Sequence, residues 1–223
     1  MSMYPISLRL GGKRCCVVGG GRVAERKVSS LLAAGASVLV ISPQLTERLA
    51  ELAAMRRIDV LLRPYADGDL ERAELVFAAT DSEDVNLSVC QEAERRGIWV
   101  NDAMSPERST FHLPAVLSRG ELQISVSTGG AGPMLSRRIR DELALVYGEA
   151  YERFVLLIGK LRQHLGSMNL SAAERRKVYE RVIDDRERFM ELLERVRTHQ
   201  ELDELVRKTA DESLRDGSIE AQR

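Results

Sequence analysis

Short apolar runs alternate with amphipathic segments over the first hundred residues. Strands are predicted where valine, isoleucine, leucine and cysteine cluster, at residues 15–18, 37–41, 58–62, 75–79 and 98–100. Amphipathic helices are predicted between them, and Gly35 and Gly97 stand where a helix commonly ends. Before the first strand, alternating positions at residues 6–10 predict a short edge strand or an extended arm. Strands that alternate with helices indicate a parallel sheet covered on both faces.

The pattern changes after about residue 103. Residues 115–126 predict either a hairpin or a strand-turn-strand extension of the sheet, and a second glycine loop follows at residues 127–133. Beyond Pro133 strand signals disappear, and helices are expected to about residue 166 with a break near Gly148. A capping box at residues 171–174 begins another helix, and the chain is expected to fray from about Asp211. We therefore place a domain change near residues 129–133.

Composition and charge exclude several classes of partner. With 223 residues, of which 44% are hydrophobic, the chain can bury a sizeable core, and it contains no apolar run of membrane-spanning length. A formal net charge of −1 argues against general attraction to nucleic acid or to a membrane surface. The three cysteines show neither C-x-x-C spacing nor a disulfide pattern, and the start of the chain lacks signal-peptide character, so we expect a cytoplasmic protein.

A glycine-rich turn follows the first predicted strand and precedes a helix. Gly19, Gly21 and Ala24 fit the spacing G-x-G-x-x-G/A of dinucleotide-binding turns. In such turns the first glycine permits the tight turn, the second lets a pyrophosphate approach the main chain, and the small third residue allows close helix packing. The N-terminus of the helix then offers N–H groups to an anion.

The end of the second predicted strand departs from the usual fingerprint. The acidic residue that commonly holds the ribose hydroxyls is replaced by Ser42-Pro43-Gln44. Because the carboxylate that would repel a 2′-phosphate is missing, the choice between NAD and NADP stays open. Arg48 could pair with such a phosphate, although a solvated helix face is its ordinary role.

Several motifs, taken in order, resemble the precorrin-2 dehydrogenase family of siroheme biosynthesis. They are residues 19–27, 78–81 with Val85-Asn86, 100–103, Phe111 with Leu113-Pro114, and 127–130 with Pro133. The similarity covers roughly residues 1–210. Members of this family oxidise precorrin-2 to sirohydrochlorin with NAD and form homodimers, and some also insert iron.

The resemblance implies an α/β fold in three parts. A Rossmann-like parallel sheet would occupy residues 1–112, a small dimerisation segment with the glycine loop and a helix residues 113–148, and an α-helical domain with a frayed tail residues 149–223. It also implies NAD as cofactor, the tetrapyrrole precorrin-2 as substrate and a homodimer. Chelatase activity stays open.

The resemblance also assigns residues to the cofactor. Arg22 and Val23 would lie along the NAD phosphates, Pro43 and Gln44 at the adenosine end, and Thr80 beside the nicotinamide half. Asp102 matches the aspartate on which the family relies for catalysis. A carboxylate there could accept the proton lost as hydride leaves, or hold the macrocycle through its pyrrole N–H groups. The structural alternative is that Asp102 caps the loop at Ser105.

Binding a substrate with eight carboxylates requires cations. Arg108, Arg137 and Arg138 are expected to contribute to an anion site, with Arg140 close by. Ser127 aligns with a family serine at the cleft entrance, where added phosphate would repel carboxylates. His112 is expected to pack or hydrogen-bond beside the cleft. Because one histidine does not make a metal site, no metal ligands are predicted.

Two other function classes remain as alternatives. A regulatory module that senses NAD without chemistry would share the glycine turn, but it would usually keep an acid after its second strand and would have no need of Asp102. A scaffold built on the same fold would bind no cofactor. We predict the dehydrogenase because it alone accounts for both glycine loops and Asp102.

Overall fold

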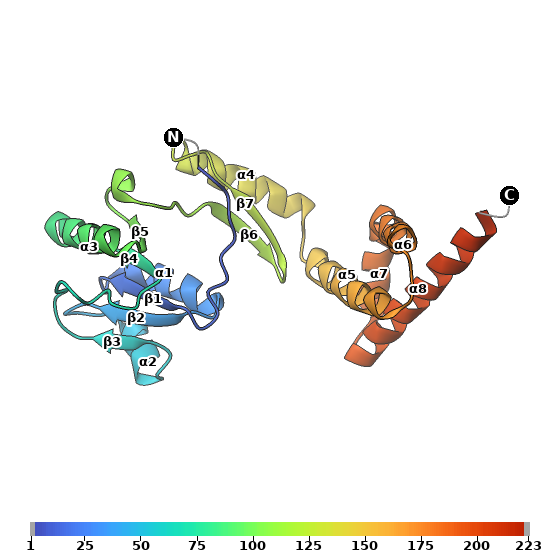
Figure 1. The fold of residues 1–223 in the computed structure, drawn as a ribbon, viewed down its shortest axis with the longest axis horizontal. Coiled ribbons are helices and arrows are strands. Elements are labelled where there is room, and N and C mark those ends of the chain that lie inside the picture. The colour runs from blue at the N-terminus through green and yellow to red at the C-terminus, as the bar shows by residue number, and fades with distance from the viewer. Residues whose placement is uncertain (1–2, 221–223) are drawn as a thin grey trace. The chain divides into compact units, whose positions relative to one another are not determined.

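A computed structural model describes residues 3–220 of the chain (Figure 1). The chain divides into two compact units, the first ending at Leu113 and the second beginning at Pro114. Each unit has its own apolar interior, with two clusters in the first and one in the second. Within the described range no helix is both long enough and apolar enough to cross a lipid bilayer.

A parallel five-stranded sheet forms the centre of the first unit. Its strands are β1 (Arg14–Val18), β2 (Ser37–Ile41), β3 (Asp59–Leu61), β4 (Leu75–Ala78) and β5 (Trp99–Asp102). Their order in the sheet is β3-β2-β1-β4-β5, and every neighbouring pair is parallel. The strand order reverses between β1 and β4, and ligands of open α/β sheets bind beyond the carboxyl ends at such a point.

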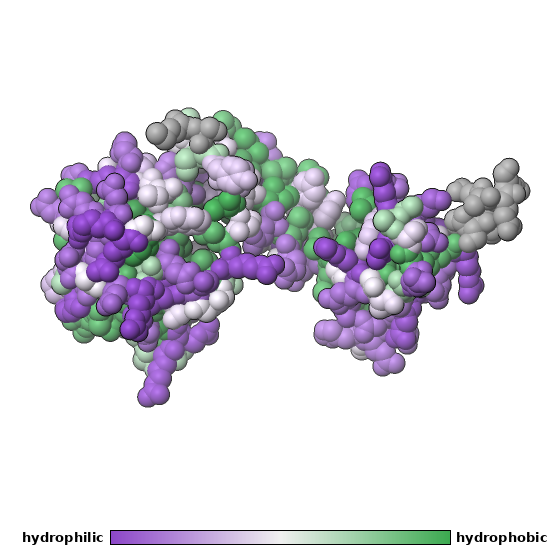
Figure 2. Space-filling view, viewed as in Figure 1, coloured by the Kyte–Doolittle hydropathy of each residue, from purple (hydrophilic) through white to green (hydrophobic). Residues whose placement is uncertain are grey.

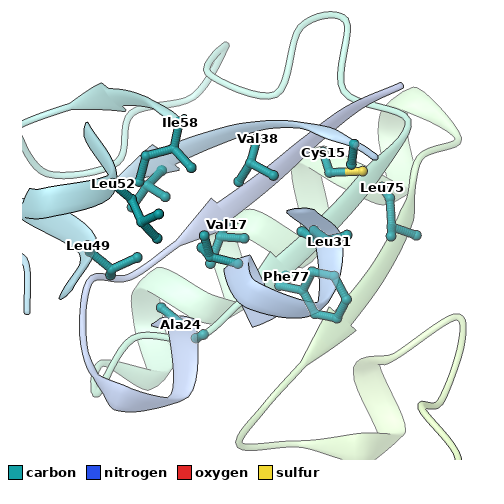
Figure 3. Close-up of a cluster of buried hydrophobic side chains, with 14 residues drawn as sticks. Cys15, Val17, Ala24, Leu31, Val38, Leu49, Leu52, Ile58, Leu75 and Phe77 are labelled. Atoms are coloured by element: carbon teal, nitrogen blue, oxygen red, sulfur yellow. The ribbon is translucent and has the colours of Figure 1, made fainter. Parts of the chain in front are cut away.

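Helices cover both faces of this sheet. Helices α1 (Arg22–Ala33) and α2 (Glu47–Ala54) pack on the face that presents Val17, Val38 and Phe77 (Figure 3). Helix α3 (Glu83–Arg96) packs on the other face, where Val18 and Val76 alternate with them. Since both faces are buried, the strands are apolar at nearly every position. The predicted α/β fold with a Rossmann-like sheet is confirmed.

Helix α3 carries polar side chains into the interior of the first unit. The carboxylate of Glu92, which has no exposed surface, accepts hydrogen bonds from the N–H groups of Gly68 (3.0 Å) and Leu70 (3.4 Å), from Arg96 Nε (2.7 Å) and from the hydroxyl of Tyr65. One side chain thereby fixes the connection between β3 and β4, which has no regular structure of its own. Burial raises the pKa of Glu92, but the hydrogen bonds from Tyr65, Gly68 and Arg96 outweigh it, and the pKa lies below its ordinary value.

The second unit consists of a hairpin and helices. Strands β6 (Ala115–Arg119) and β7 (Leu122–Val126) pair antiparallel, and α4 (Pro133–Val146) packs against both. The remaining helices, α5 (Ala150–Ser167), α6 (Ala172–Asp184), α7 (Arg186–Arg195) and α8 (His199–Glu220), share one apolar cluster. Apolar side chains also gather on the surface along α4 (Figure 2), where Met134 is 84% and Leu145 87% exposed.

Element boundaries differ from the predictions at two places, and at a third the structure decides between two predicted alternatives. Residues 3–10 form the extended arm rather than the edge strand, and Leu10 of this arm packs against the core. Strand β5 continues through Asn101 and Asp102, because their main chains pair with Phe77 and Ala78 of β4. Helix α8 continues past Asp211, where fraying was expected, since Ala210 and Ser213 are buried and Leu214 packs on the cluster. The predicted tail at residues 221–223 lies outside the described residues.

Replacing Glu92 with glutamine tests the buried carboxylate. Because the folded-state pKa is depressed, the charge contributes stability above its unfolded value of about 4.5, and this contribution is lost as the pH falls through the folded pKa. We expect Glu92→Gln to lower the free energy of unfolding at pH 7 by about 2 kcal/mol. The difference from the parent should shrink below about pH 4.5. Urea denaturation across pH 3–8 measures both quantities.

The exposed Glu94 on the same helix provides the matched control, Glu94→Gln, which should have the stability of the parent at each pH. A Glu92→Gln protein as stable as Glu94→Gln at pH 7 would contradict the importance given to this carboxylate.

Candidate functional site

The turn between β1 and α1 depends on two contacts that only glycine allows. Gly19 has a φ of +123°, and a Cβ there would lie 2.2 Å from the carbonyl oxygen of Ala79. A Cβ on Gly20 would lie 1.9 Å from the carbonyl oxygen of Gln44. Both distances are far inside van der Waals contact. The turn is therefore packed, main chain against main chain, on the loops that follow β4 and β2.

Gly21 has a different environment. A Cβ at this position would have no heavy atom within 4 Å, so no part of the protein fills the space beside it. Gly21 is also the N-cap of α1, and no side chain makes a capping hydrogen bond there. The first N–H groups of this 12-residue helix thus remain available to a ligand, with the positive end of the helix dipole behind them. This arrangement suits a phosphate group.

A cavity of about 890 Å³ opens at this turn. Most of its wall comes from the segments that follow β1, β2 and β4, at the carboxyl edge of the sheet. The residues predicted to bind the cofactor nearly all lie in the wall, namely Gly19, Gly21, Arg22, Val23, Pro43, Gln44 and Thr80. Ala24 lies beneath the wall with no exposed surface, as expected for the small residue that permits close packing of the helix. The cavity and the free helix terminus together fit a dinucleotide.

The loop after β2 is held by local hydrogen bonds. Ser42 stands at the end of β2, where many dinucleotide sites have a ribose-binding acid. Its buried hydroxyl donates to the carbonyl of Gln44 at 2.6 Å. Thr46 caps α2 through Leu49 N–H (3.3 Å), and its hydroxyl donates to Glu25 of α1 at 2.7 Å. The loop is therefore fixed to the glycine turn and offers no carboxylate to a ribose.

The loop after β4 is organised by the buried Asn86. Its Oδ1 accepts from the Thr80 hydroxyl (2.8 Å) and from Thr80 N–H (3.2 Å), and its Nδ2 donates to the Thr80 carbonyl (3.1 Å). The Thr80 hydroxyl also contacts the carbonyl of Ser82, which is the N-cap of α3. Thr80 is thus held rigidly where it enters the cavity wall.

Asp102 is buried at the end of β5, and its side chain has no exposed surface. Its Oδ1 accepts from the N–H groups of Met104 (2.8 Å) and Ser105 (3.2 Å), and its Oδ2 accepts from Arg108 Nε (2.8 Å). Asp102 therefore makes the hydrogen bonds that its loop-capping alternative requires. Asp102 is absent from the wall of the cavity at the glycine turn.

Arg108 and His112, both expected near the substrate, lie in the same unit. Arg108 also donates to Glu83 at 3.2 Å, while its buried Nη2 finds no hydrogen-bond partner among the described residues. His112 Nε2 lies 3.4 Å from the carbonyl of Pro106. The structure thus groups Arg108 with Asp102, the predicted catalytic residue, rather than with other arginines.

The remaining predicted substrate residues belong to the second unit. Ser127 is exposed and its hydroxyl accepts from Gly129 N–H (3.2 Å). Arg137 and Arg138 are exposed on α4, and Arg138 pairs with Glu142 at 3.0 Å. Their assignment to substrate stays a prediction. Across the described residues no group of three or more potential metal ligands is found.

One segment of the cavity wall was not predicted from the sequence. Pro64 and Tyr65, from the connection between β3 and β4, line it together with Val85 of α3. The connection has no periodicity that would mark it. Tyr65 next to a proline was the one available signal, because an aromatic residue in a polar loop often has a binding or packing role.

Two parts of the chain match models of known protein families. Residues 6–115 match a family model described as NAD(P)-binding, and residues 119–144 match the model "Sirohaem biosynthesis protein central". The chain belongs to the family of sirohaem biosynthesis proteins that join these two parts. The resemblance predicted from the sequence motifs is confirmed.

Curated relatives carry names from the same pathway. "Siroheme synthase 3" of Aeromonas hydrophila is 38% identical over 82% of this chain and 39% of its own length. "Siroheme synthase" of Thioalkalivibrio sulfidiphilus is 39% identical over 82% of this chain and 38% of its own length. The chain thus spans about two fifths of the length of these relatives.

A solved structure covers nearly the whole chain. The protein titled "SirC, precorrin-2 dehydrogenase" superposes with a TM-score of 0.75 at 27% identity, over 94% of this chain and 100% of its own. Both units of the chain therefore have counterparts in a single known protein.

A pair of glycine variants tests the turn. Gly21→Ala should fold with the stability of the parent, because its methyl group meets no protein atom, yet it should weaken NAD binding about tenfold or more by standing where the pyrophosphate approaches. Gly19→Ala should be destabilised by about 2 kcal/mol or more, since its methyl group overlaps Ala79 and its φ is positive. Thermal unfolding and titration calorimetry with NAD separate the two effects.

Gly12 supplies the control, since it also has a positive φ but a Cβ there meets nothing within 4 Å and it lies outside the wall. Gly12→Ala should lose some stability and keep its affinity. Unchanged NAD affinity in Gly21→Ala would show that the ligand does not approach the turn.

Proposed function

We propose that this chain oxidises precorrin-2 to sirohydrochlorin with NAD. One observation carries the proposal: the free N-terminus of α1 opens onto a cavity at the carboxyl edge of the sheet, in a chain whose matched parts are those of sirohaem biosynthesis proteins. The superposition with a precorrin-2 dehydrogenase over 94% of the chain supports the same activity. Chelation of iron by this chain stays open.

NAD is proposed over NADP on the charges of the cavity wall. Among the described residues that line it, Arg22 is the one cation, and it begins α1 beside the proposed pyrophosphate position. Arg48, the candidate partner of a 2′-phosphate, lies outside the wall and pairs with Glu51 at 2.9 Å. A 2′-phosphate at the end of β2 would therefore lack a partner.

The oxidation removes a hydride and a proton from the substrate, and the bound nicotinamide supplies the hydride acceptor. The chain's own residues bind the cofactor and the substrate and orient them. N–H groups at the start of α1 bind the pyrophosphate, and Thr80, fixed by Asn86, borders the nicotinamide half. Ser127, Arg137 and Arg138 are proposed to contact the substrate carboxylates.

Asp102 is proposed to take the proton or to hold the pyrrole N–H groups. In either role its Oδ2 must exchange the hydrogen bond from Arg108 for one from the substrate, because the carboxylate is buried and fully bonded in the structure. The same exchange would release the Arg108 guanidinium for a substrate carboxylate. The two predicted roles are thus linked through one ion pair.

We also propose a cytoplasmic location. All three cysteines are free and buried, and burial raises the pKa of Cys15 to about 11 and of Cys16 to about 12, so both stay as unreactive thiols. Free thiols of this kind suit a reducing compartment.

The activity is tested with purified protein, precorrin-2 and NAD. Sirohydrochlorin and NADH should form in equal amounts, followed by absorbance, and NADP should be a poorer oxidant. If the parent binds NAD but forms neither product, the NAD-sensing module becomes the better description. With Asp102→Asn we expect kcat to fall about a hundredfold or more, while the Kd for NAD stays unchanged because Asp102 lies outside the cavity wall.

The exposed Asp59 of β3 provides the control, Asp59→Asn, which should react at the parent rate. An Asp102→Asn protein as fast as Asp59→Asn would reject the catalytic role and leave the loop cap as the function of this carboxylate.

A homodimer is proposed to cover the apolar surface of α4. Leu145 (87% exposed) and Val146 (66%) end the helix, and Met134 (84%) and Leu135 (56%) begin it. Such a row of large apolar side chains on one helix is typical of an interface. Light scattering should give the mass of two chains for the parent and of one chain for Leu145→Glu with Val146→Glu. Leu62→Glu, equally exposed at 68% in the first unit, should stay dimeric. A monomeric parent would reject the proposal.

A further inference from the structure

Tyr65 occupies an unusual place for an aromatic residue of an irregular loop. It follows β3, lines the cavity at the glycine turn, and packs against the apolar cluster that contains Ile41 and Val89. Neither the glycine fingerprint nor the matched motifs includes it. Its role is therefore not explained by the residues that define the dinucleotide turn.

A hydrogen bond to Glu92 fixes the orientation of the Tyr65 side chain. Its hydroxyl donates to the buried carboxylate of Glu92, which is itself held by Arg96 Nε at 2.7 Å and Gly68 N–H at 3.0 Å. Burial and the neighbouring Glu92 raise the pKa of Tyr65, so its hydroxyl remains a donor. Because the polar end of the side chain is occupied, the carbon atoms of the ring are what it offers to the cavity.

The position of Tyr65 favours the adenosine half of a dinucleotide. In this topology the adenosine lies at the end of β2, while the nicotinamide lies on the β4 side of the switch point. Tyr65 comes from the chain that leaves β3, the neighbour of β2 at the outer edge of the sheet. Ile41, Pro43 and Pro64 add further apolar surface to the same wall.

The loop after β2 gives a reason for such a contact. Many dinucleotide sites hold the ribose with an acid at this position, but here Ser42 stands there with its hydroxyl bonded to Gln44 at 2.6 Å. Retention of the adenosine half must therefore depend more on the base. Purine rings stack well on aromatic and apolar side chains.

On the basis of the proposed function, we propose that Tyr65 contacts the adenine ring of the bound dinucleotide and that Glu92, through the Tyr65 hydroxyl, is the residue that positions it. Adenine binding then replaces part of the ribose recognition that an acidic residue would supply. The ligand recognised at this subsite is an adenine nucleotide, whether AMP alone or the adenosine half of NAD.

Calorimetric titration with NAD and with AMP tests the contact. Tyr65→Ala should raise both Kd values by the same factor, about tenfold, because loss of one base stacking contact has that size. Tyr65→Phe keeps the ring but loses the hydrogen bond to Glu92, so it should raise both Kd values by about threefold, less than Tyr65→Ala does. Tyr65→Leu retains apolar bulk and should fall between them, and it serves if the alanine variant fails to fold. Tyr4→Ala, an exposed tyrosine at 86%, should bind both ligands as the parent does.

Each outcome decides the proposal. Parent-like Kd values for NAD and AMP in folded Tyr65→Leu and Tyr65→Ala would overturn it, and so would a loss of NAD affinity without any loss of AMP affinity. If the parent itself binds no NAD, the proposed function fails first and the Tyr65 proposal falls with it.

The positioning role of Glu92 has a separate readout. Glu92→Gln should raise KM for NAD several-fold and leave kcat unchanged, because the reacting groups are untouched. Destabilisation alone would reduce the fraction of active protein and so lower the apparent kcat without raising KM. A fall in kcat at constant KM would therefore assign Glu92 to stability only.

Discussion

The structure of the first unit depends on a steric constraint at Gly19 and Gly20. Their main chain touches the carbonyl of Ala79 after β4 on one side and the carbonyl of Gln44 after β2 on the other. A single methyl group at either position would separate these loops. The contacts bring the ends of three strands together, and the cavity exists because the loops meet there without side chains between them. Gly21, one residue later, leaves open the space that a ligand needs.

Asp102 has the geometry of a loop cap, and the same geometry is compatible with the chemistry proposed for it. Its hydrogen bonds to Met104, Ser105 and Arg108 are those of a loop cap, and they bury the charge completely. The same bonds hold Oδ2 beside a guanidinium whose Nη2 has no partner within the described chain. Under the proposed function, a substrate carboxylate would supply the hydrogen-bond partner that Arg108 Nη2 lacks.

Local signals in the sequence account for much of the fold. The apolar runs predicted the five parallel strands, Gly97 marked the end of α3 in a left-handed conformation, and Ser171 with Glu174 formed the expected capping box. These features are readable because they depend on neighbours within four residues. The extent of β5 was underestimated, because pairing with β4 rather than hydropathy carries the strand through Asn101 and Asp102.

Contacts between distant segments could not be read in the same way. Tyr65 and Glu92 are 27 residues apart in the sequence. In the sequence alone, Glu92 and Arg96 have the spacing of an ordinary ion pair on the surface of a helix. Its complete burial follows from where the β3–β4 connection packs, which no local pattern specifies. For the cavity, the residues predicted at the glycine turn and after β2 and β4 lie in its wall, whereas Pro64 and Tyr65 line it without having been predicted.

Helix α3 contacts several loops of the first unit. Its inner face carries Asn86 to the loop after β4, Cys90 to within 3.9 Å of Asp102, and Glu92 to the connection before β4. One helix therefore fixes the positions of three loops. Inserting or deleting a single residue within α3 would rotate everything beyond it by about 100° and displace it by about 1.5 Å along the axis. A substitution on the exposed face of α3 would leave these contacts in place, whereas a change in the length of the helix would break several of them at once.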